Sequence, residues 1–395
     1  MNGIEARQCA ERLWDEYCAG IRADKGRRAE AEGHCIVFGE VKMHYTLEVV
    51  GKPGQEGYPV YIALHGGGGS STPDMNNRQW KHMGSYYRDG VENGIYVCPR
   101  GVRDTWDTHA NPESYPLYDR LIENLIVFHR ADPNRVYLLG FSAGGDGVYL
   151  AGPRLADRFA ALHMSAGHPN KNSLVNLYHT PIQLQVGMND WEYDRNHETV
   201  RYQMYLDRLR TRNPEGYVRN VYVHTEKPHN FQDNTLEHQE VLIDNISWLH
   251  GGLVTRRRVD ANAVHFLDNF VRNPLPERVI WELDARRKAK RRSVESFYWL
   301  RIPGDIKKGK AVVRLDREAN AILVERNDTG GNTTVLLKDG MLNLDRPITV
   351  LYPDGRKETC QAARSEEVMR RTLAERGDPY YMFSVEIALG RQKEK

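Results

Sequence analysis

The stretch from Arg135 to Tyr149, RVYLLGFSAGGDGVY, constrains the fold of this chain more than any other part of its sequence. It opens with a short apolar run, Val136–Leu139, which is typical of a buried strand, and it ends in residues that favour a helix. Between them lies the G-x-S-x-G pattern centred on Ser142, in the strand–turn–helix setting that the pattern requires. A serine at such a sharp turn has strained backbone angles, so the residues two positions away must be small, and both are glycine. The stretch therefore predicts Ser142 as a nucleophile.

Short apolar runs alternate with segments of helical periodicity on both sides of Ser142. This alternation predicts an α/β fold in which a mostly parallel sheet carries helices on both faces. We expect strands at residues 59–64, 95–99, 136–139, 159–164, 181–187 and 218–225, and helices at 118–130 and 196–211. Upstream, residues 1–31 have a partly apolar helical face, and the runs at 34–38 and 42–50 predict an antiparallel start to the sheet.

A histidine and a run of glycines, HGGGGS (65–70), follow the expected strand at 59–64. Glycines let the backbone fold over so that an amide faces a reacting carbonyl group. Gly66 or Gly67, together with Ala143 after the nucleophile, are the candidate donors of such an oxyanion hole. A phosphate-binding loop would need G-x-x-x-x-G-K-[ST], and no lysine follows this run. We interpret His65 as structural.

Two further strand ends carry the acid and the histidine that a nucleophilic serine needs. Asp190 follows the strand at 181–187, where the acid is expected in the chain order serine, acid, histidine, and Asp194 in the same loop is the fallback. His229 lies in the loop after the strand at 218–225. Its competitors are less free to reach Ser142, because His224 falls inside that strand and His238 on an expected following helix.

The loop after the strand at 95–99 is rich in tryptophan, aspartate and histidine. Because a loop at a strand end lies at the rim of such a site, we expect Trp106, Asp107 and His109 to bind substrate, although a merely packed loop is the alternative. Trp191, which directly follows the candidate acid, is a further candidate for a flat or apolar substrate.

Composition excludes several classes of protein. A net charge of +2 gives no case for a nucleic-acid partner, and no run approaches the 18 apolar residues of a membrane span. The first twenty residues are charged and lack the apolar core of a secretory signal. The five cysteines are scattered and fit neither a disulfide framework nor a zinc site. We therefore expect a cytoplasmic protein without a metal or other cofactor.

The length of 395 residues predicts more than one domain. We expect a helical segment at 1–33, the α/β domain at 34–252, a connector at 253–277 and a β-rich domain at 278–395. Short strand-like runs separated by glycine turns, among them a strand expected at 296–302, predict a β-sandwich-like fold for the last domain, with a helix at 366–376. The basic run at 286–292 is interpreted as a solvated connector. The last domain is expected to shape the substrate mouth, mediate self-association or add stability.

These motifs together resemble the α/β-hydrolase superfamily, and within it the esterase and poly(3-hydroxybutyrate) depolymerase-type group. The resemblance covers about residues 35–250 and rests on LHGGGG (64–69), PRGVRDTW (99–106), RVYLLGFSAGGDGVY (135–149), G-x-x-D (187–190) and PHNF (228–231). It implies an α/β-hydrolase fold and two-step acyl transfer without a cofactor. Ser142 attacks an ester carbonyl, His229 is the general base and Asp190 orients it, while amides near Gly67 and Ala143 hold the oxyanion.

The leading hypothesis is a serine hydrolase that cleaves a small-molecule or oligomeric carboxylic ester. A serine peptidase of the prolyl-oligopeptidase type is the nearest alternative, because it shares the superfamily and the triad. The alternative from another class is a non-catalytic α/β-hydrolase-like binding protein, in which the β-rich domain carries out the binding.

Overall fold

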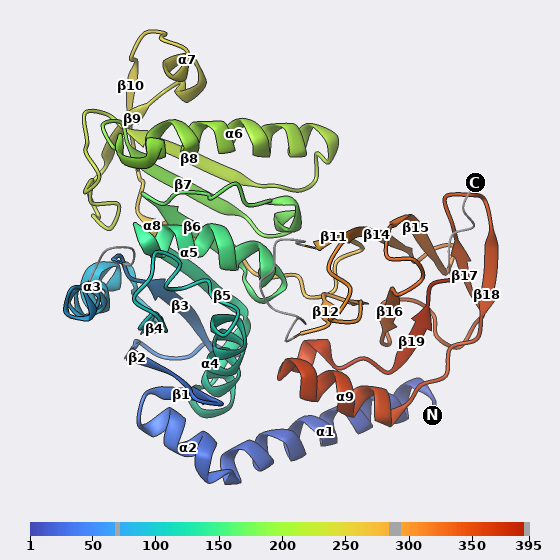
Figure 1. The fold of residues 1–395 in the computed structure, drawn as a ribbon. Helices are drawn as coiled ribbons and strands as arrows, with labels where there is room; N and C mark the ends of the chain where they lie inside the picture. The colour runs from blue at the N-terminus through green and yellow to red at the C-terminus, as the bar shows by residue number, and fades with distance from the viewer. Residues whose placement is uncertain (68–71, 284–293, 391–395) are drawn as a thin grey trace. The chain divides into compact units, whose positions relative to one another are not determined.

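The computed structural model describes residues 1–67, 72–283 and 294–390. The chain divides into two compact units, which we call the large unit (Ala29–Arg272) and the split unit (Met1–Arg28 together with Asn273–Lys395). Figure 1 traces the chain through both. The division departs from the domain boundaries expected from the sequence: the first helix joins the C-terminal part of the chain, and residues 253–272 join the α/β part. The basic run at 286–292 lies outside the described residues.

Ten strands form one sheet in the large unit, in the order β1-β2-β4-β3-β5-β6-β7-β8-β9-β10. The six strands from β4 to β8 in this order are parallel, whereas β1, β2, β9 and β10 pair antiparallel. The prediction of an α/β unit with a mostly parallel sheet is confirmed. The strands are β1 (Cys35–Phe38), β2 (Val41–Val50), β3 (Tyr58–Leu64), β4 (Gly94–Pro99), β5 (Ala131–Phe141), β6 (Ala161–Ser165), β7 (Ile182–Gly187), β8 (Arg219–His224), β9 (Gln239–Leu242) and β10 (Arg256–Val259).

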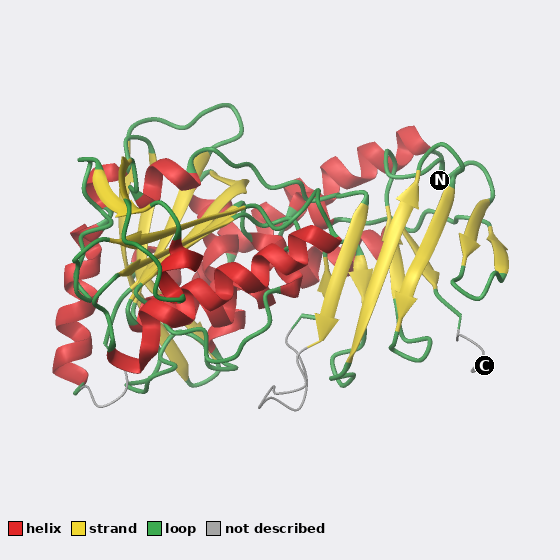
Figure 2. Ribbon diagram, turned by 90° about the horizontal axis from the view of Figure 1, so that it is seen from above, coloured by secondary structure: helices red, strands yellow, loops and turns green. Residues whose placement is uncertain are grey.

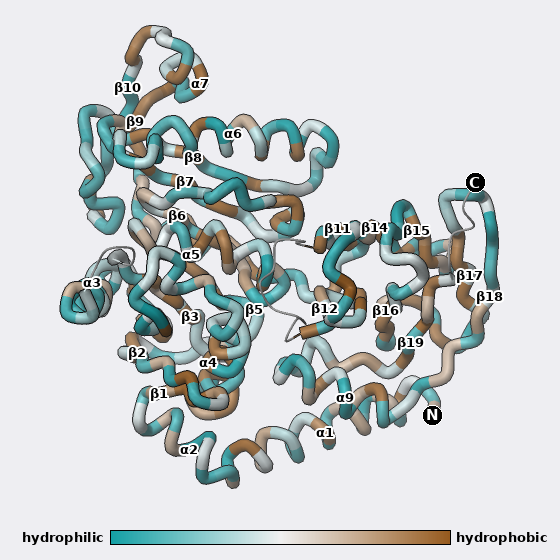
Figure 3. The backbone as a smooth tube through the Cα atoms, in the orientation of Figure 1, coloured by the Kyte–Doolittle hydropathy of each residue, from teal (hydrophilic) through white to brown (hydrophobic). Residues whose placement is uncertain are grey.

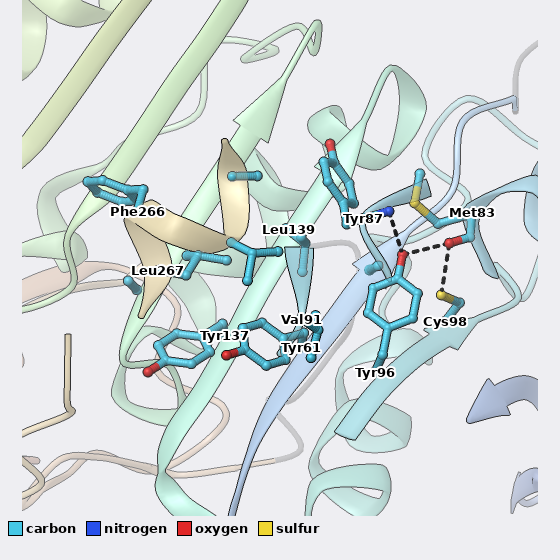
Figure 4. Packing of buried hydrophobic residues seen from close by; sticks show 14 of the residues in the cluster. Tyr61, Met83, Tyr87, Val91, Tyr96, Cys98, Tyr137, Leu139, Phe266 and Leu267 are labelled. Carbon is cyan, nitrogen blue, oxygen red and sulfur yellow. Dashed lines mark hydrogen bonds between the residues drawn. The ribbon is translucent and has the colours of Figure 1, made fainter. Parts of the chain in front are cut away.

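Helices lie on both sides of this sheet (Figure 2). Alternate residues of a strand point to opposite faces. On one face, Tyr61 of β3 and Leu139 of β5 pack with Met83 of α3 and Leu267 of α8 (Figure 4). On the other face, Leu64 of β3 lies against α5. The helices are α2 (Lys25–Glu32), α3 (Pro73–Tyr86), α4 (Ser114–His129), α5 (Ala143–Ala151), α6 (Arg195–Arg212), α7 (Asn245–Leu249) and α8 (Ala263–Leu267). No helix within the described ranges is long and apolar enough to cross a membrane.

Three local predictions need correction. The helix expected at residues 1–31 breaks at Asp24, whose backbone is extended, into α1 (Gly3–Ala23) and α2. The expected connector at 253–277 contains β10, which pairs with β9 and extends the main sheet. The strand expected at 296–302 is a hairpin of β12 (Ser296–Phe297) and β13 (Leu300–Arg301), because Tyr298 adopts a φ of 51° and reverses the chain.

The split unit joins the two ends of the chain. Helix α1 begins at a capping box formed by Asn2 and Glu5, and its tube alternates between hydrophilic and hydrophobic stretches (Figure 3). Its apolar side, including Leu13, packs on α9 (Glu366–Arg376) through Met369 and Leu373. One sheet has the order β11 (Arg278–Leu283), β14 (Gly309–Asp316), β15 (Ala321–Asn327), β17 (Ile348–Leu351) and β18 (Lys357–Cys360). The other has the order β12, β13, β16 (Thr334–Leu337) and β19 (Val385–Ala388).

A buried aspartate fixes the loop that follows β8. Asp233 is fully buried and accepts hydrogen bonds from His163 of β6 at 2.7 Å, from Tyr87 at 2.8 Å and from Tyr86 at 2.9 Å. Burial alone would raise the pKa of Asp233, but these three donors, His163 first, outweigh it and hold the pKa below its ordinary value. Asp233 therefore ties the loop to the core of the sheet four residues after His229.

Replacement of this carboxylate is expected to destabilise the fold. The variant Asp233→Asn replaces a buried acceptor of three hydrogen bonds by an amide that leaves some of these donors unpaired, so the free energy of unfolding should fall by about 3 kcal/mol or more. The matched control is Asp260→Asn, because Asp260 pairs with His265 at the same 2.7 Å but at the surface. That variant should lose less than about 1 kcal/mol. Urea unfolding measures both, and equal losses would contradict the role given to burial.

Candidate active site

Ser142 stands at the junction of β5 and α5 with a φ of 59° and a ψ of −120°, a conformation that non-glycine residues rarely adopt. The glycines on either side are required by contact. A Cβ atom on Gly140 would lie 2.3 Å from the carbonyl oxygen of Gly144, and one on Gly144 would lie 2.0 Å from that of Leu64. The chain therefore turns as sharply as the sequence pattern predicts, and the serine lies above the end of the sheet.

A chain of hydrogen bonds connects Ser142 to two other loops. Ser142 Oγ lies 3.0 Å from His229 Nε2, and His229 Nδ1 lies 2.7 Å from Asp190 Oδ2. A carboxylate only accepts, so Nδ1 carries the proton and Nε2 is left to accept from the serine hydroxyl. The Asp190 side chain is 1% exposed and that of His229 is 31% exposed. The structure thus brings together the three side chains singled out in the sequence.

The sheet explains why three distant residues meet. Ser142, Asp190 and His229 follow β5, β7 and β8, and the carboxyl ends of these parallel strands share one edge of the sheet. The loop after β7 also packs tightly on the loop after β8. A Cβ atom on Gly187 would lie 2.1 Å from the carbonyl oxygen of Pro228, and the Asn189 amide donates to Lys227 at 2.8 Å.

The competing residues lie elsewhere. Asp194 pairs with Arg201 at 2.5 Å and with His197 at 2.7 Å, away from His229. His224 is buried in β8 and shares a hydrogen bond of 2.6 Å with Gln185. His238 is exposed in a loop just before β9, so the helix expected there is wrong.

The glycine loop comes close to the nucleophile. A Cβ atom on Gly66 would lie 3.3 Å from the Cβ of Ser142. Gly67 has a φ of +101°, and a Cβ atom there would lie 2.1 Å from Asn76 Oδ1, so no other residue fits. Ala143 is the first residue of α5. Residues 68–70 of the glycine run lie outside the described residues.

Two buried histidine rings hold the carbonyl groups of this loop. His65 Nε2 accepts from the amide of Gly101 at 3.0 Å, so its Nδ1–H donates to the carbonyl oxygen of Gly66 at 2.6 Å. His109 Nε2 lies 2.8 Å from the carbonyl oxygen of His65 and donates to it. In a trans peptide the N–H points opposite to the carbonyl group. The two rings therefore fix the directions in which the amides of Gly66 and Gly67 point.

The prediction that His109 lies on the substrate rim is wrong. Its side chain packs beneath the glycine loop with an exposed fraction of 1%, because the ring fills the space beside Gly147 and His65. Burial lowers the pKa of His65 to about 4 and that of His109 well below its ordinary value. Both rings are therefore neutral at pH 7.

The other rim candidates are accessible. Trp106 is 48% exposed and Trp191 is 58% exposed. The Trp191 ring contacts His197 edge to face at 5.4 Å, and Asp107 accepts from Thr105 Oγ1 at 2.8 Å. Among residues 1–67, 72–283 and 294–390, no cluster of three or more His, Cys, Asp or Glu side chains is suited to hold a metal ion.

Two charged residues beside the site were missed by the sequence analysis. Arg195 donates from Nη1 to Asp190 Oδ1 at 3.0 Å. Asp146, one turn after Ser142 on α5, accepts from the amide of His168 at 2.6 Å, and burial raises its pKa to about 6. The position of Asp146 four residues after the nucleophile is a signal that the sequence contains, whereas the contact of Arg195 depends on the folded loop.

The large unit thus combines a mostly parallel sheet, a sharp turn at Ser142 and a relay of hydrogen bonds from Ser142 through His229 to Asp190. The chain resembles the α/β-hydrolases. Within that superfamily it resembles the esterase and poly(3-hydroxybutyrate) depolymerase-type group. No family model matches the chain. The bifunctional acetylxylan esterase/xylanase XynS20E of Neocallimastix patriciarum is 29% identical over 114 residues, which cover 28% of this chain and 16% of that protein. The chain thus matches about a sixth of the length of this relative.

Three solved structures, of an esterase, a depolymerase and a hydrolase, are similar over half of the chain or more. A thermostable esterase is 17% identical, with 60% of this chain and 62% of that chain covered and a TM-score of 0.41. LpqC, the poly(3-hydroxybutyrate) depolymerase from Bordetella parapertussis, is 16% identical, with coverages of 61% and 97% and a TM-score of 0.40. An S-formylglutathione hydrolase from Agrobacterium tumefaciens is 16% identical, with coverages of 50% and 87% and a TM-score of 0.37. The α/β fold of the large unit is shown by the order and direction of its strands.

The buried neutral state of His65 makes stability depend on pH. Its pKa of about 4 in the folded chain lies below the unfolded value near 6.5, so the unfolded state binds more protons between these values. Its contribution is therefore complete above about pH 6.5 and is lost as the pH falls towards 4. Over this range the unfolding free energy of the wild type should fall by about 2–3 kcal/mol more than that of His65→Asn. The asparagine amide keeps a donor near the position of Nδ1. Urea unfolding at several pH values measures this difference, and parallel curves would contradict it.

Proposed function

We propose that this chain is a serine hydrolase that cleaves carboxylic esters through Ser142, His229 and Asp190. The observation that carries the proposal is the relay of two short hydrogen bonds, at 3.0 Å from serine to histidine and at 2.7 Å from histidine to aspartate. Its tautomer suits a general base, because the histidine nitrogen that faces the serine is free to take a proton.

The reaction would proceed in two steps. His229 Nε2 takes the hydroxyl proton as Ser142 Oγ attacks the ester carbonyl carbon, and the alcohol leaves with that proton. Water then attacks the acyl-enzyme with His229 again as base, which releases the acid and restores the serine. Asp190 holds the ring and stabilises the imidazolium that forms in each step.

Backbone amides would stabilise the oxyanion. Ala143, at the N-terminus of α5, supplies one donor, and Gly66 or Gly67 supplies the other. The proximity of the glycine loop to Ser142 and the fixed peptides of residues 65–67 support this role. Loss of one such donor typically lowers the rate by about 10²–10³-fold.

We propose that the exposed side chains of Trp106 and Trp191, together with Asp107, contact the substrate. An ester is favoured over an amide because the relative that matches part of the chain is named an acetylxylan esterase. Peptide hydrolysis by the same three residues is the second candidate, and a binding protein without catalysis is the third.

Turnover of p-nitrophenyl acetate and butyrate, beside peptide p-nitroanilides, tests this proposal. The wild type should hydrolyse the esters, and Ser142→Ala should lose at least about 10⁴-fold in kcat because the nucleophile is absent. Faster cleavage of the anilides would favour a peptidase. Folded wild-type protein that cleaves neither class would favour the binding protein.

Asp190 and Asp194 both lie in the loop after β7, and a separate experiment tests which of them is the acid. Asp190→Asn should lower kcat by about 10³–10⁴-fold, because the amide favours the wrong tautomer of His229. Asp194→Asn is the matched control, since asparagine tolerates the left-handed backbone at this position, and it should stay within about twofold of the wild type. Ester turnover of both variants measures this. A larger loss of kcat in Asp194→Asn than in Asp190→Asn would show that Asp194 is the acid.

We also propose that the two sheets of the split unit pack face to face as a sandwich. The stacked rings of Trp281 in β11 and Phe297 in β12, with centroids 5.6 Å apart, support this arrangement. The catalytic domain is proposed to correspond to the large unit, Ala29–Arg272.

A further inference from the structure

Arg195 contacts the acid of the proposed relay through the carboxylate oxygen that His229 does not use. Its Nη1 lies 3.0 Å from Asp190 Oδ1, whereas His229 Nδ1 lies 2.7 Å from Oδ2. The Arg195 side chain is 10% exposed, so this guanidinium group is withdrawn from solvent. Such a contact is not the loose ion pair of a protein surface.

The two oxygens of this carboxylate have no other support. Among the described residues, Asp190 has two hydrogen-bond partners for its carboxylate, His229 for one oxygen and Arg195 for the other. The side chain is 1% exposed, so water does not replace a lost donor. Without Arg195, a buried charged oxygen would be left unpaired, and the carboxylate would be free to rotate about its last bond.

The loop after β7, which carries Asp190, folds back so that Arg195 contacts Asp190. Tyr193 and Asp194 have φ values of 56° and 58°, two successive left-handed residues that reverse the chain before α6. The amide of Asn196 then bonds to the carbonyl oxygen of Asp190 at 3.2 Å. The guanidinium group also lies over the ring of Tyr193, 5.0 Å from its centroid. Strain of this kind persists where the surrounding contacts enforce it.

We propose that Arg195 is a positioning residue for the hydrolytic reaction, acting through Asp190 to hold its carboxylate in line with His229. This inference rests on the proposed function. The role is one of orientation rather than of charge, because a cation 3.5 Å from His229 Nδ1 opposes the imidazolium that forms during catalysis. Arg195 therefore contributes through the donor that it supplies.

The variants Arg195→Met and Arg195→Lys separate these effects. Methionine removes the donor and keeps much of the volume, so kcat for p-nitrophenyl acetate should fall by about 10–100-fold, with KM changed by less than about threefold. Lysine keeps one charged donor and should recover most of kcat. Arg201→Met is the matched control, because Arg201 lies on the same helix and pairs with Asp194 and Glu198 at the surface. It should behave as the wild type.

A double-mutant cycle with Asp190→Asn gives the readout that a merely structural role would not produce. If Arg195 acts through Asp190, adding Arg195→Met to Asp190→Asn should cost less than about twofold in kcat. If Arg195 only supports the fold, the second substitution should cost its full factor again. Thermal midpoints of all variants identify any that fails to fold, and if Arg195→Met does, Arg195→Leu, which also lacks the donor, takes its place in the cycle.

The outcomes distinguish this inference from the proposed function. Wild-type protein without Ser142-dependent ester turnover would overturn the proposed function itself. Wild-type turnover with an Arg195→Met variant of unchanged kcat, or with additive losses in the cycle, would overturn the positioning role alone. A loss in Arg195→Met that vanishes in the Asp190→Asn background would support it.

Discussion

The left-handed backbone of Ser142 is the constraint on which the rest of the large unit depends. A residue forced to a φ of 59° between β5 and α5 is stable only if the helix lies directly on the end of the sheet. That approach leaves no room for side chains at Gly140 and Gly144, whose positions face backbone atoms at 2.3 and 2.0 Å. The loop after β3 also lies close to Ser142, and it carries Gly66 and Gly67, the candidates for the second proposed oxyanion donor beside Ala143.

Burial decides which groups around this turn are neutral and which are charged. His65 and His109 are kept neutral by burial, and their rings hold two consecutive peptides by donating to carbonyl oxygens. Asp190 and Arg195 are withdrawn from solvent together as a pair of opposite charge. Deeper in the sheet, the hydrogen bond between Asp233 and His163 ties the loop of His229 to the core. The geometry of the site therefore depends on polar contacts that the solvent does not reach.

The sequence predicted the features that depend on local pattern. Ser142, Asp190 and His229 were found because each follows a strand in a fixed chain order, and parallel strands bring their ends together. The burial of His109 was missed, because a polar loop gives no signal that its histidine will fill space beneath another loop. The contact of Arg195 was missed because the chain reverses at Tyr193 and Asp194. Both adopt a left-handed backbone, and neither is a glycine that would indicate a turn in the sequence. The packing of α1 on α9, at the opposite end of the chain, depends on contacts of long sequence separation.

The proposed role of Ser142 as a nucleophile depends on its sharp turn and on its hydrogen bond to His229. The most direct measurement is to react the folded protein with a fluorophosphonate and to map the adduct by mass spectrometry of its peptides. We expect one adduct, on the peptide that contains Ser142, and none in a protein with alanine at this position. An adduct on another residue, or no adduct on folded protein, would contradict it.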